Sequence, residues 1–185
     1  MWVTLDGEGF VFYIERTKKM FFLSTFNTKR LTAIMEIRRA TIDDADVVAE
    51  FNGLMAEETE HRKLEKKTLL QGVKAVLNDP AKGIYFVVEE RGALLGQLMI
   101  TYEWSDWRNG NFWWIQSVYV RKEFRQLGVF RSLYEHVEGL ARKRNDVCGL
   151  RLYVERENER ARQTYEKLGM KPAIYEMFEK DFVTG

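Results

Sequence analysis

The residues of this sequence best suited to chemistry lie between a predicted strand and a predicted helix. A helix is expected to begin near Gly128, with Arg125 and Arg131 close by in the chain. The first amides of a helix have no acceptor inside it and lie at the positive end of its dipole, so they bind anions, most often phosphate. Because glycine has no Cβ, a pyrophosphate can approach Gly128 closely while the two arginines add charge-assisted contacts. The segment predicts a site for a phosphorylated ligand, although a lone glycine can also simply start a helix.

Two common phosphate-binding patterns are absent around this glycine. No Walker lysine follows Gly128, and the three-glycine pattern of dinucleotide-binding folds is missing. ATP hydrolysis and NAD chemistry therefore lose their main support from the sequence.

Two strand and helix pairs must position this site. Residues 112–120 are apolar and rich in β-branched and aromatic types, which predicts a buried strand. The helix that follows has apolar residues spaced three and four apart, namely Phe130, Leu133, Tyr134, Val137, Leu140 and Ala141. Residues 148–154 then alternate as a second strand. Asn158 stands where the N-cap of a last helix belongs, and Gly169 is its expected C-terminal stop.

Each of the two units carries a motif. The first motif is Tyr119-Val120, four residues, then Arg125-x-x-Gly128. The second is Asn158-x-x-Ala161-x-x-x-Tyr165-x-x-Leu168-Gly169-Met170. Together the two motifs resemble those of the GNAT superfamily of acyl-CoA N-acyltransferases. The resemblance covers about residues 36–180. It implies acetyl-CoA as co-substrate, no metal, and two strands, ending at Val120 and Val154, that splay apart to admit the pantetheine arm.

The resemblance also implies where the coenzyme lies. Its phosphates would contact the turn and the helix start, and its pantetheine chain would contact the strand end and Asn158. A backbone amide near Val118 would stabilise the oxygen that becomes negative during acyl transfer, an effect of roughly 3 kcal/mol per donor. The expected cofactor-binding residues are Val118, Tyr119, Val120, Arg125, Gln126, Leu127, Gly128, Val129, Phe130, Arg131, Asn158 and Tyr165.

Tyr165 occupies the position that the resemblance assigns to the general acid for the departing thiolate. A phenol with a pKa of about 10 protonates the thiolate of a thiol with a pKa of about 8.5 only uphill, by about 2 kcal/mol. We therefore expect Tyr165 either to protonate the sulfur or only to hydrogen-bond it. The residue pattern alone would place Tyr165 in the core, because it shares a helical stripe with Ala161 and Leu168. Asn158 likewise has a structural role as a cap besides its implied contact with pantetheine.

The attacking amine must lose a proton, which calls for a base near neutrality. Glu103, at the end of its predicted strand, is the candidate catalytic base and Asp106 is the second choice, although acidic residues at strand ends are often only solvated. Trp104 and Trp107 belong to a tryptophan cluster that could form the wall of an acceptor site, since an aromatic face attracts an ammonium by about 1 to 2 kcal/mol. The cluster could equally pack a hairpin and the core.

Two positions depart from the family pattern. Phe130 stands where the resemblance implies a small residue, which alters the pocket near the phosphates. Gln116 and Ser117 stand where the polyamine and diamine acetyltransferase branch, which residues 104–120 resemble most, has an acidic pair. Without these charges a polycation loses its anchor, so we expect a smaller amine or amino-acid-like acceptor. The expected substrate contacts are Trp104, Asp106, Trp107 and Gln116.

Composition describes an ordinary globular protein. The 185 residues include 29 basic and 28 acidic side chains, so bulk charge gives no reason to expect a nucleic-acid partner. No apolar stretch is long enough for a membrane span and no secretion signal is evident, so we expect a cytoplasmic protein without a membrane partner. We expect residues 1–34 to be an extension and residues 35–185 to be the functional domain. The rival is a folded extension that packs on the domain or on a second subunit; a homodimer is one expected assembly.

The order of predicted elements is β-α-α-β-β-β-α-β-α-β, an α/β (mixed α+β) architecture. We expect a central, twisted, mostly antiparallel mixed sheet of about six or seven strands with helices on both faces. The predicted strands are residues 36–39, 84–89, 94–103, 112–120, 148–154 and 174–178. The predicted helices start at Thr41, at Thr68, near Gly128 and after Asn158.

The sequence thus favours an acetyl-CoA-dependent N-acetyltransferase that acts on the primary amine of a small molecule by direct attack in a ternary complex. Two alternatives stay open at this point. One is a peptide or protein N-acetyltransferase, and the other is a non-catalytic module that binds acyl-CoA.

Overall fold

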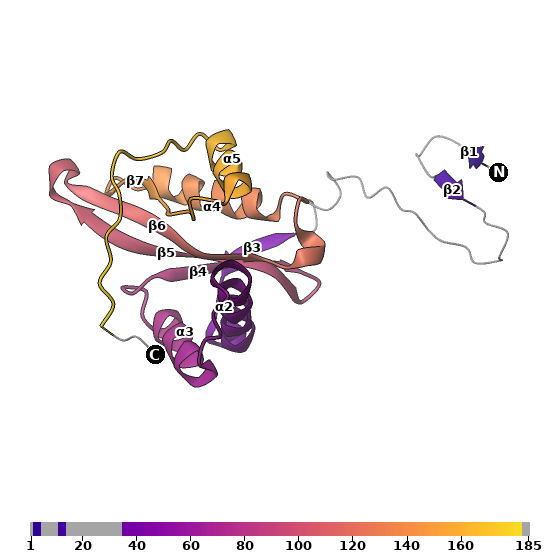
Figure 1. The fold of residues 1–185 in the computed structure, drawn as a ribbon, viewed down its shortest axis with the longest axis horizontal. Helices are drawn as coiled ribbons and strands as arrows, with labels where there is room; N and C mark the ends of the chain where they lie inside the picture. Colours follow the sequence, from indigo (N-terminus) through magenta and orange to yellow (C-terminus); the bar gives the residue numbers. More distant parts are fainter. Residues whose placement is uncertain (1, 5–10, 14–34, 183–185) are drawn as a thin grey trace.

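The computed structural model describes residues 2–4, 11–13 and 35–182 (Figure 1). Near the N-terminus, β1 (Trp2–Thr4) pairs antiparallel with β2 (Val11–Tyr13). The rest of the predicted extension, residues 1–34, lies outside the described residues, so its separation from the domain stays a prediction.

A five-stranded sheet forms the centre of the domain, in the order β3-β4-β5-β6-β7. All neighbours are antiparallel except β6 and β7, which are parallel. The predicted mixed and mostly antiparallel sheet is confirmed, with fewer strands than the six or seven expected. The strand bounds are β3 (Glu36–Arg39), β4 (Ile84–Glu90), β5 (Ala93–Ser105), β6 (Gly110–Val120) and β7 (Val147–Arg151).

Helices cover both faces of this sheet (Figure 1). On one face lie α2 (Ala45–Glu60) and α3 (Lys66–Asn78), and on the other lie α4 (Val129–Arg142) and α5 (Glu159–Lys167). Short 3-10 helices span Ile42–Asp44, Asp106–Arg108 and Lys122–Phe124. Within the described part of the chain, no helix is both long and apolar enough to cross a bilayer.

The alternation of side chains along β4 explains why the sheet is covered twice. Phe86 and Val88 are buried in the core beside α4, whereas Tyr85 and Val87 are buried in the core beside α2 and α3. Successive residues of a strand point to opposite faces, so an apolar run makes two cores at once.

The predicted last strand, residues 174–178, is wrong. These residues take part in no sheet of the structure, and their apolar side chains are exposed. The apolar and aromatic residues of this segment were a valid sign of strand propensity. A strand also needs hydrogen bonds to a neighbouring edge, and in the structure residues 174–178 pair with none.

The start of α2 is fixed by the carboxylate of Asp44. It accepts hydrogen bonds from the backbone N–H of Thr41 at 2.7 Å and from the guanidinium of Arg38 at 2.7 and 2.9 Å. Thr41 and Asp44 thus form a capping box at the predicted helix start. Arg38 also pairs with Glu89, so one cluster joins β3, β4 and the helix start.

We expect Asp44→Asn to lower the free energy of unfolding by about 2 kcal/mol at neutral pH, because it weakens a part-buried, charged hydrogen-bond network. The hydrogen bond from Arg38 lowers the pKa of Asp44. Asp44 therefore stabilises the fold above its unfolded pKa of about 3.9, and this stability is lost as pH falls through the lower folded pKa. Urea unfolding of both proteins at decreasing pH tests this. A difference that stays constant into strong acid would contradict it.

Candidate functional site

Pairing between β6 and β7 stops partway along β6. The two strands pair only from Asn111 to Trp114 on β6, and β7 ends at Arg151 while β6 continues to Val120. The pairing therefore stops where the resemblance implies a splay, but the predicted strand end at Val154 is wrong by three residues. A cavity of about 710 Å³ lies beside the unpaired part of β6, bounded by the following turn, the start of α4 and one face of α5. A volume of this size suits a cofactor or large substrate.

Ten of the twelve predicted cofactor-binding residues line this cavity. The two exceptions are Tyr119 and Leu127. Tyr119 is buried on the opposite face of the sheet, where its ring lies 5.0 Å from that of Phe51. Sequence reasoning missed six lining residues, namely Phe124, Arg160, Ala161, Gln163, Thr164 and Lys167. Four of these recur at helical spacing on one face of α5, a signal that the sequence already contained.

The backbone ahead of α4 forms a cradle of amide groups. Gly128 has φ of 87° and Gln126 has φ of 68°, so the chain turns through two left-handed residues before the helix. The first amide bonded back into this turn is that of Ser132, to the carbonyl of Gly128 at 2.9 Å. Among the residues described, the N–H groups of residues 126 to 131 donate to no acceptor. A Cβ added to Gly128 would enter open space, so the space before these amides is clear.

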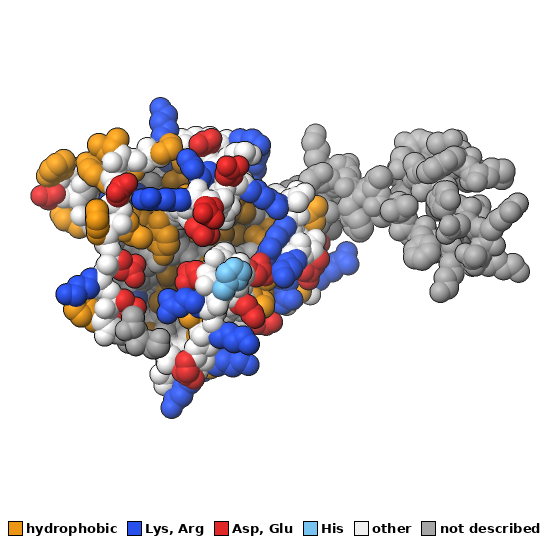
Figure 2. Space-filling view, viewed as in Figure 1, with side chains coloured by type: hydrophobic (Ala, Val, Ile, Leu, Met, Phe, Trp, Pro, Cys, Tyr) orange, Lys and Arg blue, Asp and Glu red, His pale blue; other side chains and the backbone are white. Residues whose placement is uncertain are grey.

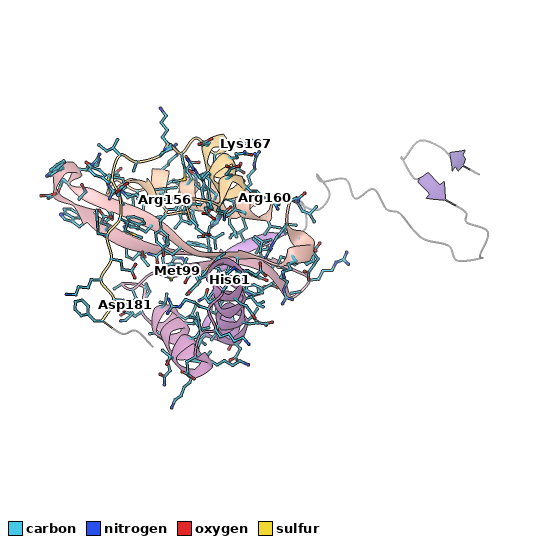
Figure 3. All side chains as sticks on the ribbon, viewed as in Figure 1. His61, Met99, Arg156, Arg160, Lys167 and Asp181 are labelled. Atoms are coloured by element: carbon cyan, nitrogen blue, oxygen red, sulfur yellow. The ribbon has the colours of Figure 1, made fainter. Side chains whose placement is uncertain are left out.

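Among the residues that the structure describes, those that line this cavity are positively charged or neutral, and none is acidic. Of its four cations, Arg131, Arg160 and Lys167 have no ion-pair partner within the described ranges. Arg160 and Lys167 both extend from α5 (Figure 3). Bare amides, a helix N-terminus and unpaired cations together favour an anion with several phosphate groups.

Arg125 has a different role from the other three cations. Its Nη2 donates to Glu58 of α2 at 2.7 Å, and its Nε donates to the carbonyl of Val120 at 2.8 Å. Burial opposes ionisation of Glu58, but Arg125 and Lys122 together lower its pKa. The predicted phosphate contact thus braces the turn against α2, although Arg125 still borders the cavity. Sequence reasoning could not find this pair, because its members lie 67 positions apart.

A β-bulge interrupts β6 at the cavity. Gln97 pairs with Tyr119 and Met99 with Gln116, so Ser117 and Val118 together face the single residue Leu98. Ser117 has φ of 49°, an uncommon value for a side chain other than glycine or asparagine. A bulge of this kind re-aims backbone groups and is common near active sites.

A buried chain of polar side chains supports this bulge. The amide nitrogen of Gln97, which is fully buried, donates to the carbonyl of Ser117 at 3.3 Å and to Asn52 Oδ1 at 2.7 Å. Asn52 in turn donates to the hydroxyl of Tyr85 at 2.9 Å. Gln97 Oε1 has no hydrogen-bond partner in the described structure. Burying three polar side chains is costly, which makes the backbone conformation they hold a candidate for function.

Tyr165 lies across the cavity from β6, on α5. Its ring meets that of Phe130 edge to face, with centroids 5.7 Å apart. Burial raises the pKa of the Tyr165 phenol, so it stays protonated at neutral pH. Phe130 is the residue of the motif that departs from the family pattern. It packs against the phenol ring and forms part of the cavity wall. Asn158 accepts from the N–H of Ala161 at 3.0 Å, which confirms it as the cap of α5.

The predicted base Glu103 lies in a different environment. It accepts hydrogen bonds from the indole of Trp114 and from Arg151, the latter at 2.6 Å. The bond from Trp114, with help from Arg151, lowers the pKa of Glu103. A carboxylate that takes a proton from an ammonium near neutral pH needs a raised pKa. The pKa of Glu103 is lowered, which is the opposite of what a catalytic base requires. Glu103 is also paired in register with Phe112, six residues along β6 from Val118, roughly 20 Å away.

The other predicted substrate contacts do not come together at the cavity. Trp104, Asp106 and Trp107 lie at the outer end of the β5–β6 hairpin, and both tryptophans are exposed. Gln116 lies next to the bulge, where its amide donates to Thr101 Oγ1 at 2.7 Å. Of the four residues, only Gln116 lies near the splay of the strands.

A second cavity of about 540 Å³ lies between the hairpin and the end of α4. Its lining includes Arg39, Tyr102, Lys143 and Arg144. Lys143 is the C-cap of α4, so this cavity lies at the negative end of the helix dipole, and the acidic side chain of Asp146 also lines it. For a phosphorylated ligand the first cavity is therefore the better site.

Comparisons with known proteins identify the family of the chain. The sequence model of the Acetyltransferase (GNAT) family matches residues 46–170. A possible acetyltransferase from Clostridium difficile 630 is 47% identical, with a TM-score of 0.77, and the match covers 82% of this chain and 99% of that one. A comparison with curated proteins gives no significant match.

Two more distant solved structures share the fold. A predicted acetyltransferase with acetyl-CoA from Clostridium acetobutylicum is 17% identical, with a TM-score of 0.66 over 80% of this chain and 97% of that one. A ribosomal-protein-alanine N-acetyltransferase from Brucella melitensis is 19% identical, with a TM-score of 0.65 over 80% of this chain and 99% of that one.

Proposed function

Because the chain belongs to the acetyltransferase (GNAT) family, we propose that it moves the acetyl group of acetyl-CoA to the primary amine of a small molecule by direct attack in a ternary complex. The observation that carries the proposal is the acid-free cavity beside the splayed end of β6. It combines the bare amides at the start of α4, three cations that have no ion-pair partner among the described residues, and a protonated phenol.

The donors of the cavity fit the coenzyme. The amides of residues 126 to 131 would bind its pyrophosphate, with Arg131, Arg160 and Lys167 adding charge. Val118 and Val120 offer an apolar wall for the pantetheine arm, and the amide group of Asn158 can reach it from the start of α5.

The bulge serves the acyl-transfer step in this proposal. Val118 has no register partner on β5, so its N–H is our candidate donor to the thioester oxygen that becomes negative. A donor fixed in place before reaction lowers the barrier by about 3 kcal/mol in comparable sites.

Tyr165 completes the site as a hydrogen-bond donor to the departing sulfur. Its raised pKa keeps the phenol protonated, which favours donation, and makes full proton transfer to a thiolate less favourable than for an ordinary tyrosine. We therefore propose that Tyr165 stabilises the thiolate by a hydrogen bond. The proton that the thiolate finally takes up would come from water or from the positively charged nitrogen of the amine that has attacked.

The attacking amine must be neutral. Because the pKa of Glu103 is lowered, this carboxylate is a poor base for taking the proton from the amine. We propose that the amine is deprotonated by water before it attacks. Since a free amine has a pKa of about 10, the rate at low acceptor concentration should rise with pH through the neutral range.

A panel of amines, assayed by release of free thiol from acetyl-CoA, tests the proposed function. We expect small monoamines and amino-acid-like amines to react, and polyamines to react less well because Gln116 is neutral. If only a peptide N-terminus is acetylated, the acceptor is a peptide or protein and not a small molecule. No thiol release above the hydrolysis background with any amine, despite acetyl-CoA binding, would support the non-catalytic alternative.

Gln97→Leu should lower kcat about tenfold or more while the dissociation constant of acetyl-CoA changes less than about threefold. The reason is that leucine cannot donate to the carbonyl of Ser117, so the bulge loses the bond that holds it, and one transition-state donor is misplaced. Steady-state kinetics and calorimetric titration measure the two quantities.

Asn52→Ala is the matched control for Gln97. It removes the hydrogen bond between Gln97 and Asn52 from the buried network but leaves the bond from Gln97 to the carbonyl of Ser117 in place. We expect it to lower the melting temperature while kcat falls much less. Equal losses of kcat in both variants would mean that the network is only structural.

A further inference from the structure

The second cavity exists because the helix above the sheet is shorter than the strands below it. β5 has 13 residues and β6 has 11, whereas α4 has 14. A strand rises about 3.3 Å per residue and a helix about 1.5 Å, so β5 spans about 43 Å and α4 only about 21 Å. Figure 1 shows the β5–β6 hairpin reaching past the end of α4. The cavity of about 540 Å³ lies over the part of the sheet that α4 does not cover.

Four neighbouring strands supply the floor of this cavity. The lining residues are Arg39 at the end of β3, Ile84 and Phe86 of β4, Tyr102 of β5 and Trp113 of β6. The rings of Tyr102 and Trp113 meet edge to face, with centroids 6.4 Å apart. Because Tyr102 is still 36% exposed, apolar surface remains for a ligand to cover. Such a floor suits the face or edge of an aromatic ring.

The rim of the cavity carries an excess of positive charge. Arg39 and Lys143 have no ion-pair partner within the described part of the chain. Arg144, in contrast, donates to both carboxylate oxygens of Asp146, at 2.8 and 2.7 Å, so these two charges cancel. The end of α4 adds only about half a negative charge, which two cations outweigh. This modest excess favours a single carboxylate over a ligand with several phosphates.

The phenol of Tyr102 adds a hydrogen-bond donor beside these cations. Burial raises its pKa, and the nearby charges of Arg39 and Arg144 offset this shift only in part. The hydroxyl is therefore protonated at neutral pH, and it has no hydrogen-bond partner among the residues that the structure describes. A phenol and two cationic side chains are donors that bind a carboxylate.

We propose that this cavity is a second ligand site, which binds a small aromatic carboxylate with its ring against Ile84 and Tyr102 and its carboxylate between Arg39 and Lys143. Pockets for small molecules have volumes of about 300 to 1,000 Å³, and this one has about 540 Å³. Trp113 lies five residues along β6 from Val118, about 17 Å away. The carboxylate and acetyl-CoA can therefore be bound at the same time, and the proposal does not depend on acetyl transfer.

A titration of ¹⁵N-labelled protein with naphthalene-2-carboxylate, without and with acetyl-CoA, tests this site. We expect a dissociation constant of about 1 mM or tighter in both cases. The largest amide shifts should fall at Asn111, at Trp113 and at residues 143 to 146. Shifts at residues 126 to 131 that acetyl-CoA abolishes would place the acid in the first cavity and overturn the proposal. An unchanged spectrum at about 10 mM acid would also overturn it.

A neutral ligand and three variants test the role of charge. Naphthalene-2-carboxamide has nearly the same shape but no charge, and should bind at least about tenfold more weakly. Arg39→Gln and Lys143→Gln should each raise the dissociation constant of the acid about tenfold. Arg142→Gln is the matched control, because Arg142 pairs with Glu138 and does not line the cavity. It should change the dissociation constant less than about twofold. Equal binding of acid and amide, or equal losses in all three variants, would contradict the proposed carboxylate site.

Discussion

Tyr165→Phe should lower kcat about 100-fold while acetyl-CoA affinity changes less than about threefold. The substitution keeps the ring that packs on Phe130 and removes only the hydroxyl, which we propose stabilises the departing thiolate. A donor that acts only in the transition state affects turnover and leaves ground-state binding intact. Single-turnover thiol release and calorimetric titration with acetyl-CoA measure the two effects.

Tyr134→Phe provides the matched control. Tyr134 also packs its ring against Phe130, with centroids 6.3 Å apart, but it lies in the core and does not line the cavity. This variant should keep kcat within about twofold, since it removes no group near the reacting atoms. Unchanged kcat in Tyr165→Phe would remove the phenol from the mechanism. Equal losses in both variants would show that ring packing, not the hydroxyl, matters.

Gly128→Val should raise the dissociation constant of acetyl-CoA about 100-fold. A β-branched side chain at φ of 87° is strained, and its Cβ would occupy the open space before the amide cradle. Relief of the strain and the added bulk would each displace backbone donors from the phosphates. Losing one or two hydrogen bonds to a charged group costs about 1.5 to 3 kcal/mol each, which matches the expected change in affinity.

Gly139→Ala on the same helix separates the local effect from a general loss of stability. Gly139 has no neighbour within contact distance of an added Cβ and has ordinary helical φ. Alanine there should stabilise α4 by up to about 1 kcal/mol and leave acetyl-CoA binding unchanged. If Gly128→Val bound acetyl-CoA as tightly as the unaltered protein, the pyrophosphate would lie elsewhere.

Local sequence signals predicted most of the elements around the cavity. Gly128, Asn158 and the apolar spacing of the helices each reflect a requirement of their own neighbourhood, a turn, a cap or a buried stripe. Such requirements are satisfied within a few residues, so a single sequence displays them. The predicted strand at residues 36–39 and the cap at Asn158 match the structure at residue level.

Features that depend on distant partners could not be predicted in this way. The pairing of Arg125 with Glu58 joins the turn to α2, and the bond of Gln97 to Ser117 joins β5 to β6. Neither leaves a periodic trace in the chain. The tryptophan cluster shows the same limit, because Trp104 and Trp107 lie close to Gln116 in sequence while the hairpin holds them away from the bulge. The segment at 174–178 had the composition of a strand, but it joins no sheet in the structure.

Hydrophobic side chains are unevenly exposed on the surface of the domain. Figure 2 shows hydrophobic side chains gathered toward the hairpin end of this face, and the exposed residues there include Trp104, Trp107 and Tyr153.

The most direct test of the account is a titration of ¹⁵N-labelled protein with acetyl-CoA, followed by amide chemical shifts. If the coenzyme lies on the amide cradle, the largest shifts should fall at residues 126 to 131, with further changes at Val118 and at the start of α5. Shifts confined to the second cavity, around Arg39, Tyr102 and Lys143, or an unchanged spectrum at millimolar ligand, would contradict it.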